Sequence, residues 1–281
     1  MGSMNMEGNN VEIFEVGPCE NNYQLGFLIG QRFSKLIRSR LATDLILQNQ
    51  LLPFAQSPLS TPLIHSLSET NRKAFPGYWD ELQGTSDGSG VPFLQATLFD
   101  GTTFTAYTYA GELPSCAFGF NSHGVAFTLN SVPPTEEEIV AGGIGRNFIS
   151  RDLLESKSID DALTRISSSE ASVGHSYNLV DTRTRRILNV ETASRYRVSV
   201  LEAHDENTLS RQKRAASLPK GSKSDYLELL GDMHDKKYPI YMTGPLLHTL
   251  CTAVIDVDER TLSIIQGNPK KNAASYVFSM S

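Results

Sequence analysis

Residues 116–130 read CAFGFNSHGVAFTLN, and this stretch indicates the fold more clearly than any other part of the chain. Two short runs rich in aromatic and β-branched residues flank the turn-forming tetrad Asn121-Ser122-His123-Gly124. Such a pattern is typical of a β-hairpin, because asparagine and glycine tolerate the backbone angles of a tight turn. We therefore predict two antiparallel strands here.

The same hairpin pattern recurs three times along the chain. The stretches are residues 97–109 (TLFDGTTFTAYTY), 176–191 (SYNLVDTRTRRILNVE) and 248–266 (HTLCTAVIDVDERTLSIIQ). In the first of them, Asp100-Gly101 is a strong signal for a type I′ turn. An edge strand over residues 11–18, closed by Gly17-Pro18, is predicted before them. Antiparallel pairing is thus expected in most of the chain after residue 97.

Helices are predicted between these strands from apolar residues at helical spacing. They are expected over residues 23–40, over 45–52 with a stop at Pro53, over a stretch ending near Leu82, twice within 146–170 with Ser158 opening the second, and in the polar stretch 207–232. Residues 84–90 (GTSDGSG) are predicted to be a loop from their composition. Hairpins with helices grouped between them predict an α+β fold, with two antiparallel sheets facing each other and helices outside.

Composition limits the classes of partner and compartment. The 281 residues are 40% hydrophobic and 20% charged, which fits one large globular domain or two small ones. A net charge of −6 argues against a nucleic acid or an anionic membrane as partner. The first ten residues lack a signal-peptide pattern, and no apolar window is long enough to span a membrane. Three cysteines without metal spacing favour a reducing compartment, so we expect a cytoplasmic protein.

Metal and anion motifs are weak. His204-Asp205-Glu206 and His234-Asp235 lack the spacing of a zinc site, so no metal is expected. Residues 256–261 (DVDERT) imitate part of a calcium loop, but a hairpin turn explains them better. The run Gly142-Gly143-Ile144-Gly145 precedes a predicted helix and could hold an anion, such as part of an acyl-CoA, at the helix N-terminus.

Several segments resemble a known family. They are residues 17–33 (GPCENNYQLGFLIGQRF), 81–93 (ELQGTSDGSGVPF), 106–134 (AYTYAGELPSCAFGFNSHGVAFTLNSVPP), 143–163 (GIGRNFISRDLLESKSIDDAL), 174–200 (GHSYNLVDTRTRRILNVETASRYRVSV), 238–242 (YPIYM) and 249–269 (TLCTAVIDVDERTLSIIQGNP). They follow one another in family order over nearly the whole chain. The chain resembles the plant branch of the acyl-CoA:6-aminopenicillanate acyltransferase-like proteins (peptidase family C45), which are N-terminal-nucleophile (Ntn) hydrolases.

This resemblance implies an αββα sandwich and a catalytic mechanism with a cysteine nucleophile. In such proteins a precursor cuts itself before a cysteine, whose new α-amino group serves as base for its own thiol. The acyl group of an amide (C–N) substrate or of an acyl-CoA then forms a thioester, and water or an amine receives it. The implied domain is a single one, with residues 1–95 as a helical pro-segment-like part and residues 96–281 as a truncated β-rich part.

The chain departs from the family at the position of the nucleophile. Family members place it in an Asp-Cys-Thr or Asp-Cys-Ser context, but here residues 91–95 run directly into residues 96–99. A second, shorter block is missing after Val200. Two clean gaps with matching flanks point to skipped exons or a faulty gene model. We therefore expect an incomplete, truncated isoform that is catalytically impaired, with no nucleophile in place.

Candidate site residues follow from the resemblance. Asn178 matches the strand asparagine that supplies an oxyanion donor, and Asn130 could face the same pocket, although a strand or turn role explains each as well. Cys116 is a weak candidate nucleophile, since the family has it outside the cleavage site, and Thr102 is a weaker one. His175 could line the site.

The remaining candidates are predicted to have structural roles. They are Cys19 and Cys251 as structural cysteines, Glu191 in an ion pair at the sheet rim, and Arg151 as a solvated or ion-paired guanidinium on a helix.

Two function classes stay open beside a metal-dependent hydrolase, which only scattered acidic and histidine residues suggest. One is an amidohydrolase or N-acyltransferase that acts on a small-molecule amide or an acyl-CoA, with no cofactor. The other is a non-catalytic binding or interaction remnant of the same fold, because lost strands leave an exposed sheet edge. The absence of an Asp-Cys-Thr/Ser site between Gly90 and Thr103 favours an impaired protein.

Overall fold

The computed structural model of the chain describes seven stretches in two compact units. The stretches are residues 13–89, 93–97, 102–131, 134–202, 215–235, 239–244 and 248–280. Unit 1 comprises Met1–Leu201 and unit 2 comprises Glu202–Ser281. The single domain expected from the family stays a prediction.

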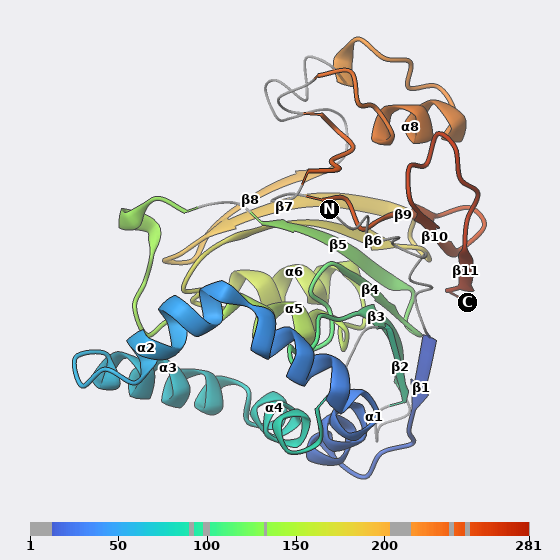
Figure 1. Cartoon of the computed structure of the whole chain (residues 1–281). Coiled ribbons are helices and arrows are strands. Elements are labelled where there is room, and N and C mark those ends of the chain that lie inside the picture. Colours follow the sequence, from blue (N-terminus) through green and yellow to red (C-terminus); the bar gives the residue numbers. More distant parts are fainter. Residues whose placement is uncertain are drawn as a thin grey trace, which may run out of the picture. The chain divides into compact units, whose positions relative to one another are not determined.

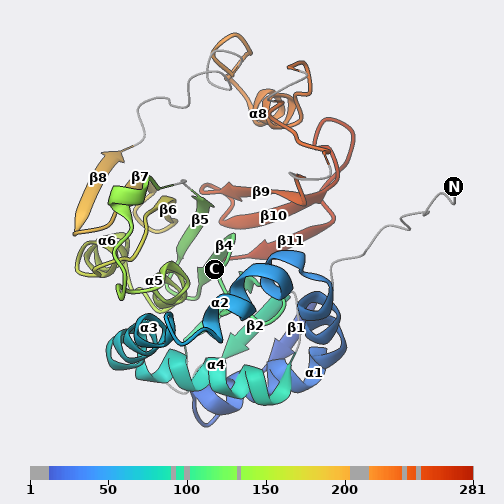
Figure 2. The same cartoon turned by 60° about the vertical axis from the view of Figure 1, so that its left-hand side comes forward.

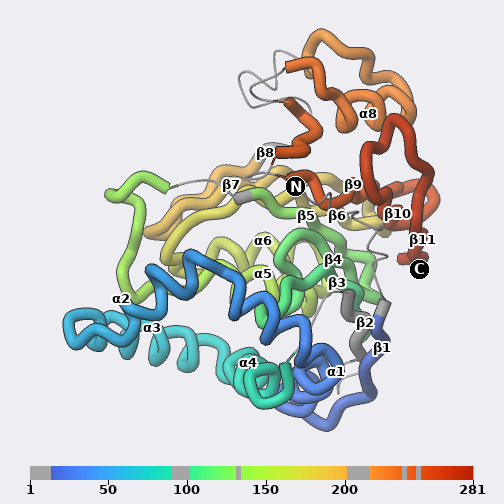
Figure 3. The backbone as a smooth tube through the Cα atoms, in the orientation of Figure 1, coloured from blue at the N-terminus to red at the C-terminus, as the bar shows by residue number. Residues whose placement is uncertain are grey.

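Unit 1 is built on an eight-stranded sheet whose strands follow one another in chain order (Figures 1 and 3). The strands are β1 (Ile13–Val16), β2 (Phe93–Thr97), β3 (Thr103–Tyr107), β4 (Phe118–Asn121), β5 (Val125–Ser131), β6 (His175–Asp181), β7 (Arg186–Ala193) and β8 (Arg197–Glu202). β1 pairs in parallel with β2, and β2 to β7 pair antiparallel. The edge strand and the hairpins predicted over residues 116–130 and 176–191 are confirmed. β2 and β3 form the hairpin expected around Asp100-Gly101, but its first strand lies at residues 93–97, before the predicted start at residue 97.

Turn residues fix these hairpins. Thr97 lies opposite Thr103, while the Asp100-Gly101 turn falls outside the described residues. Between β4 and β5, Gly124 has a φ of +77°, which is the left-handed conformation that favours glycine. Between β6 and β7, Asp181 Oδ1 accepts hydrogen bonds from the backbone N–H groups of Arg183 (2.9 Å) and Thr184 (3.2 Å). An Asx turn therefore closes this hairpin.

Six α-helices accompany the sheet. They are α1 (Asn22–Thr43), α2 (Leu52–Ala55), α3 (Thr61–Ala74), α4 (Pro76–Gly88), α5 (Arg146–Leu153) and α6 (Ile159–Ser167), with a π-helix η1 (Leu47–Leu51) and a short 3₁₀ helix η2 (Glu136–Glu138). Asn21 caps α1 and Ser158 caps α6, each by accepting a backbone N–H, so the predicted helix starts are confirmed.

Two predicted helix boundaries, both near a proline, were wrong. Pro53 does not stop a helix, because helical backbone continues from η1 (Leu47–Leu51) into α2, where Pro53 lies in the first turn. The helix expected to end near Leu82 is two helices, because the chain leaves helical geometry at Phe75, directly before Pro76.

The loop predicted over residues 84–90 is also wrong, because α4 continues to Gly88. α1 and α4 lie side by side (Figures 1 and 2), and four glycines stand at their contact: Gly26, Gly30, Gly84 and Gly88. A Cβ atom on Gly84 would collide with the backbone carbonyl of Tyr23. The glycines are thus selected for close approach of two helices and not for a loop.

One face of the sheet packs on helices and forms the main core of unit 1. The core joins residues of α1, α5 and α6 with alternate residues of the strands, among them Phe33, Leu153, Ala162, Phe104, Phe127, Tyr177, Leu179, Leu188 and Val190. In Figure 1, α5 and α6 lie against this face of the sheet. Because strand side chains alternate, the residues in between point to the opposite face.

The described residues of unit 2 include a second, smaller sheet and the helix α8. Its elements are α8 (Lys223–Leu230), β9 (Cys251–Asp256), β10 (Thr261–Gln266) and β11 (Tyr276–Ser279), and β10 pairs antiparallel with both neighbours. The last predicted hairpin is confirmed as β9–β10. Asp256 Oδ1 accepts the backbone N–H groups of Asp258 (3.2 Å) and Glu259 (3.1 Å), so residues 256–261 contain a hairpin turn.

The fold class is α+β with antiparallel sheets, as predicted. The face-to-face stacking of the two sheets in an αββα sandwich stays a prediction. Among the described residues, none of the helices is both long and apolar enough to span a bilayer.

Candidate functional site

The candidate site is a polar row on the sheet face that points away from the helices. β5, β6 and β7 place Thr128, Asn178 and Asn189 directly opposite one another in register. Their chain neighbours Phe127, Leu179 and Leu188 point into the core on the other face. Polar side chains in the middle of three adjacent strands are unusual, and they generally either form hydrogen bonds with one another or take part in function.

Hydrogen bonds connect this row across the three strands. Asn178 Nδ2 donates to Thr128 Oγ1 at 3.0 Å, and Asn178 Oδ1 accepts from Asn189 Nδ2 at 3.0 Å. Asn189 Nδ2 also lies 3.3 Å from Ser176 Oγ. The amide of Asn178 is held at both ends, so its orientation is fixed while it remains half-buried.

Asn130 joins the same face one row further along. It lies opposite Ser176, which in turn lies opposite Glu191, and both Asn130 and Glu191 are exposed. The structure therefore brings the two predicted asparagines, Asn130 and Asn178, onto one face in neighbouring rows. The row holding Asn178 carries only uncharged groups, which donate and accept hydrogen bonds without titrating near neutral pH.

The polar row can bind a carbonyl or amide group. A side-chain amide carries two N–H donors, and Thr128 uses one of those on Asn178. A fixed amide donor beside a hydroxyl is the kind of group that stabilises a developing oxyanion, an effect worth about 3–4 kcal/mol per donor when it is removed from an enzyme. The sequence analysis did not find Thr128 or Asn189. The register of the predicted 176–191 hairpin places Asn189 opposite Asn178, whereas the pairing of Thr128 with Asn178 joins strands that are distant in the chain.

His175 does not join this site. It is on the same strand as Asn178 but three residues away, so it points to the helix-facing side, where its ring meets that of Tyr177 edge-on at 5.6 Å. Burial, together with the nearby Arg146, lowers the pKa of His175 to about 4. Within the described part of the chain, its Nδ1 has no hydrogen-bond partner. His175 is therefore a neutral, buried ring.

Cys116 is held as a neutral thiol. Its Sγ donates to Glu112 Oε2 at 3.2 Å and lies 3.3 Å from the carbonyl of Leu113. Burial raises the pKa of this thiol well above its usual range, and the negative charge of Glu112 raises it further. Glu112 is itself paired with Arg40 (2.6 Å) and accepts from Asn147 (2.9 Å). A nucleophilic cysteine needs the opposite surroundings, which favour the thiolate.

The other two cysteines and Thr102 are no better placed. Burial raises the pKa of Cys19, and it raises the pKa of Cys251 to about 11. Thr102 is buried, with its Oγ1 3.4 Å from His123 Nε2. The residues that precede Thr102, where a cleavage would have to occur, lie outside the described residues.

Arg151 is fully buried and ion-paired, so the expected solvated guanidinium is wrong and the expected ion pair is confirmed. Its Nη2 lies 2.9 Å from Glu81 Oε2, and both side chains have no exposed surface. Its guanidinium also lies 4.7 Å from the ring centroids of Tyr78 and Phe104. This pair connects α4, α5 and β3 inside unit 1. Its role is to hold the helical layer together.

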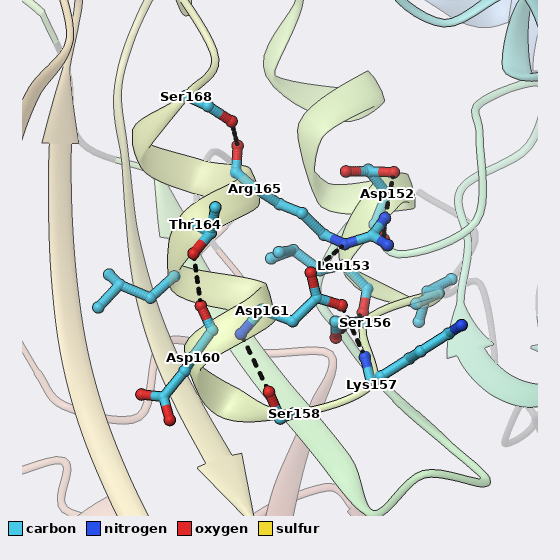
Figure 4. Close-up of polar contacts among 12 residues, drawn as sticks. Asp152, Leu153, Ser156, Lys157, Ser158, Asp160, Asp161, Thr164, Arg165 and Ser168 are labelled. Carbon is cyan, nitrogen blue, oxygen red and sulfur yellow. Dashed lines mark hydrogen bonds and ion pairs between the residues drawn. The ribbon is translucent and has the colours of Figure 1, made fainter.

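A second polar network extends this connection to α6 (Figure 4). Arg165 Nη1 donates to Asp152 Oδ1 at 2.7 Å, and Arg165 Nε donates to Asp161 Oδ1 at 3.2 Å. Asp152 also accepts the hydroxyl of Tyr78 at 2.9 Å. Ser158 Oγ accepts the backbone N–H of Asp161 at the start of α6. These contacts are structural and lie among the helices.

The glycine run before α5 does not form an anion site. The backbone N–H of Gly143 donates to the carbonyl of Val140 (3.2 Å), that of Ile144 to Glu170 (2.9 Å) and that of Gly145 to Asn71 Oδ1 (2.8 Å). Because these donors are engaged inside the protein, they are not available to a phosphate.

No metal site is found in the stretches that the structure describes, where no three histidine, cysteine or acidic side chains converge. His204-Asp205-Glu206 lies outside those stretches. The backbone N–H of His234 donates to Asp232 Oδ1.

Comparison with known proteins gives a family and a relative. A family model described as "Acyl-coenzyme A:6-aminopenicillanic acid acyl-transferase" matches residues 89–271, which is more than half of the chain. The chain is also 22% identical over 358 residues to the β-alanyl-dopamine/carcinine hydrolase of Drosophila melanogaster, covering 89% of this chain and 92% of that protein. The alignment is longer than the 281 residues of the chain, so parts of the relative have no counterpart in it.

Proposed function

We propose, from the premise that this chain belongs to the acyl-coenzyme A:6-aminopenicillanic acid acyl-transferase family of acyltransferases and amide hydrolases, that it binds a small amide or acyl-CoA substrate of that family and is impaired in turning it over. The observation that carries the proposal is the row Thr128–Asn178–Asn189. It retains oriented amide donors on the sheet face, while the segment expected to bear the nucleophile is absent.

Binding of a planar amide follows from the row's geometry. The amide of Asn178 is fixed by Thr128 and Asn189, so a substrate carbonyl meets a donor that needs no reorganisation. In intact relatives this donor would stabilise the oxyanion formed when a cysteine thiolate attacks the amide carbon. The attack breaks the C–N bond after proton transfer to the leaving amine, and water or another amine then cleaves the thioester.

Loss of turnover is supported by the cysteines that remain. The chain has three, and none lies between Cys19 and Cys116, where the cleavage site is expected. Burial raises the pKa of all three thiols, so each is held in the form that does not attack a carbonyl. The alignment with the Drosophila hydrolase, longer than this chain, is consistent with missing internal blocks.

The first test is the intact mass of the purified protein under denaturing, reducing conditions. We expect a single uncut chain of 30.9 kDa and no dopamine released from β-alanyl-dopamine, the amide named for the relative. Two fragments, with a new N-terminal cysteine, serine or threonine on one of them, would contradict the proposal and would identify the nucleophile.

The second test measures binding at the polar row. Isothermal titration with β-alanyl-dopamine and with an acyl-CoA is expected to give heat with the wild-type chain and at least about tenfold weaker binding with Asn178→Ala, because a buried carbonyl loses its donor. The matched control is Asn49→Ala, which removes an exposed asparagine in η1 that is not part of the polar row. Equal affinities for all three proteins would remove the polar row from the proposal.

Two further proposals concern origin and compartment. The two missing blocks are attributed to exon skipping in a plant transcript or to a faulty gene model, and sequencing of the transcript would distinguish the two. A cytoplasmic location is supported by the three free cysteines, and a fluorescent fusion would check it.

A further inference from the structure

An exposed apolar segment extends from the end of α1 through η1 and α2, and we name residues 36–59 the apolar arm. In Figure 1 it runs from α1 toward the left edge of the view, where α2 passes into α3. Its large side chains that face solvent are Leu36, Leu41, Leu45, Ile46, Leu51, Leu52, Phe54 and Leu59. Neither η1 nor α2 contains a buried residue, and Leu59 is 94% exposed.

The apolar arm begins as a continuation of the core-facing side of α1. The buried stripe of that helix recurs every four residues through Leu25, Ile29, Phe33 and Ile37. Leu41 is the next member of the stripe, yet it is 43% exposed. The stripe thus runs past the body of unit 1 that covers it. Apolar surface that continues a core stripe gains free energy when a second surface removes it from water.

The charge pattern of the arm selects the kind of partner. Arg38, Arg40 and Asp44 lie in the first part of the arm, whereas residues 45–59 contain no aspartate, glutamate, lysine or arginine. The lack of cations in residues 45–59 disfavours nucleic acid and anionic membranes as partners of this part of the arm, because basic residues bind both. In a two-fold pair the same patch contributes from both sides, so an uncharged patch meets its copy without like-charge repulsion.

The area of the arm fits a pair of chains. Its eight solvent-facing side chains are on average half exposed and together offer on the order of 800 Å², about what each partner of a standard interface contributes. Exposed apolar patches of this size exceed those of typical monomers. We propose that the apolar arm is the interface through which two copies of this chain pair about a two-fold axis.

The test is the molar mass of the chain in solution, measured by light scattering across a dilution series. The wild-type chain gives twice its 30.9 kDa mass at high concentration and dissociates on dilution. The double variant Leu45→Glu with Ile46→Glu raises the dissociation constant at least about a hundredfold, because desolvated like charges meet across the two-fold axis. A wild-type chain that stays monomeric throughout overturns the proposal, and so does a double variant that pairs like the wild type.

Two further variants separate pairing from folding. Val277→Glu places a charge on an equally exposed apolar position of β11, outside the arm, and leaves the dissociation constant unchanged. If the double variant loses its thermal transition in circular dichroism, Leu59→Lys decides instead, because this side chain touches little of its own chain. A folded Leu59→Lys variant with weakened pairing supports the arm as the interface, and one with unchanged pairing overturns it.

Discussion

Arg151 and Glu81 form a charge pair whose side chains have no exposed surface, so loss of either partner leaves a buried charge in unit 1. Replacing Arg151 by Met leaves the Glu81 carboxylate buried without its partner. We expect the free energy of unfolding to fall by about 3–5 kcal/mol, because a buried charge is stranded. Urea denaturation followed by circular dichroism measures this change.

The control for this prediction is an ion pair between β7 and α6 that is exposed to solvent. Arg186 lies 2.9 Å from Asp160, and the aspartate is largely exposed. Arg186→Met should change the free energy of unfolding by less than about 1 kcal/mol, as is usual for surface pairs. Similar losses of unfolding free energy in both variants would mean that burial does not determine how strongly the Arg151–Glu81 pair stabilises the fold.

His175 makes the stability of the fold depend on pH. Burial lowers its pKa to about 4, below the ordinary value near 6.5, so the folded state favours the neutral ring. Between pH 4 and 6.5 the unfolded chain binds more protons at this histidine than the folded chain does. The contribution of His175 is therefore fully present above pH 6.5 and is lost as the pH falls toward 4, on the order of 3 kcal/mol in total.

A variant isolates this contribution from that of the carboxylates. His175→Gln is less stable at pH 7 through altered packing, but its free energy of unfolding should fall less steeply between pH 6.5 and 4.5 than that of the wild type. His65→Gln, at an exposed position in α3, should keep the wild-type slope. Urea titrations at several pH values give these slopes, and parallel curves for wild type and His175→Gln would refute the prediction.

At the scale of elements, the contact between α1 and α4 depends on glycine. Alanine has a higher helix propensity than glycine by about 1 kcal/mol, so Gly84→Ala would stabilise an isolated α4. In the folded chain the new methyl group meets the backbone of Tyr23 in α1. We expect a net loss of about 1–3 kcal/mol, since α1 must move away and carry its core stripe with it.

Ser86→Ala is the matched control, because Ser86 is on the exposed side of the same helix. It should be neutral or slightly stabilising. Thermal melting of both variants tests the contact, and a Gly84→Ala variant more stable than the wild type would show that α1 and α4 do not touch as described.

The same elements show what the sequence can and cannot predict. The hairpins were predicted because their alternation and turn residues are local features, as at Gly124 and at the Asp181 turn. The end of α4 was predicted wrongly because a glycine-rich composition, as in residues 84–90, is shared by loops and by close helix contacts. Only the partner helix distinguishes the two cases, and its position is a tertiary property.

The candidate site shows the same division. Asn178 was found from a family resemblance, whereas Thr128 and Asn189 depend on the register of three strands. The register of Asn189 against Asn178 follows from counting residues across the β6–β7 turn. That of Thr128 does not, because η2, α5 and α6 lie in the chain between β5 and β6. His175 and Asn178 point to opposite faces because side chains alternate along a strand. This separation could therefore be predicted from the sequence. The burial of Arg151 could not, because its partner Glu81 is seventy residues away.

At the scale of the whole molecule, burial raises the pKa of all three thiols of a chain whose family members use a reactive cysteine. An Ntn cysteine reacts readily at neutral pH because its surroundings favour the thiolate. Here burial acts in the opposite direction on Cys19, Cys116 and Cys251 alike. If turnover is impaired for the reason proposed, this should be visible as a property of the entire chain.

We expect the native chain to react with iodoacetamide at pH 8 at least about tenfold more slowly than the same chain in denaturant, because raised thiol pKa values lower the thiolate fraction. Mass spectrometry of the labelled protein would count three modified cysteines only after denaturation. Cys116→Ser should leave the native labelling rate unchanged, since that thiol is bonded to Glu112 and already neutral. A single cysteine that labels rapidly in the native state, with the rapid phase abolished by one Cys→Ser change, would identify an activated nucleophile. That result would make this chain an active member of its family.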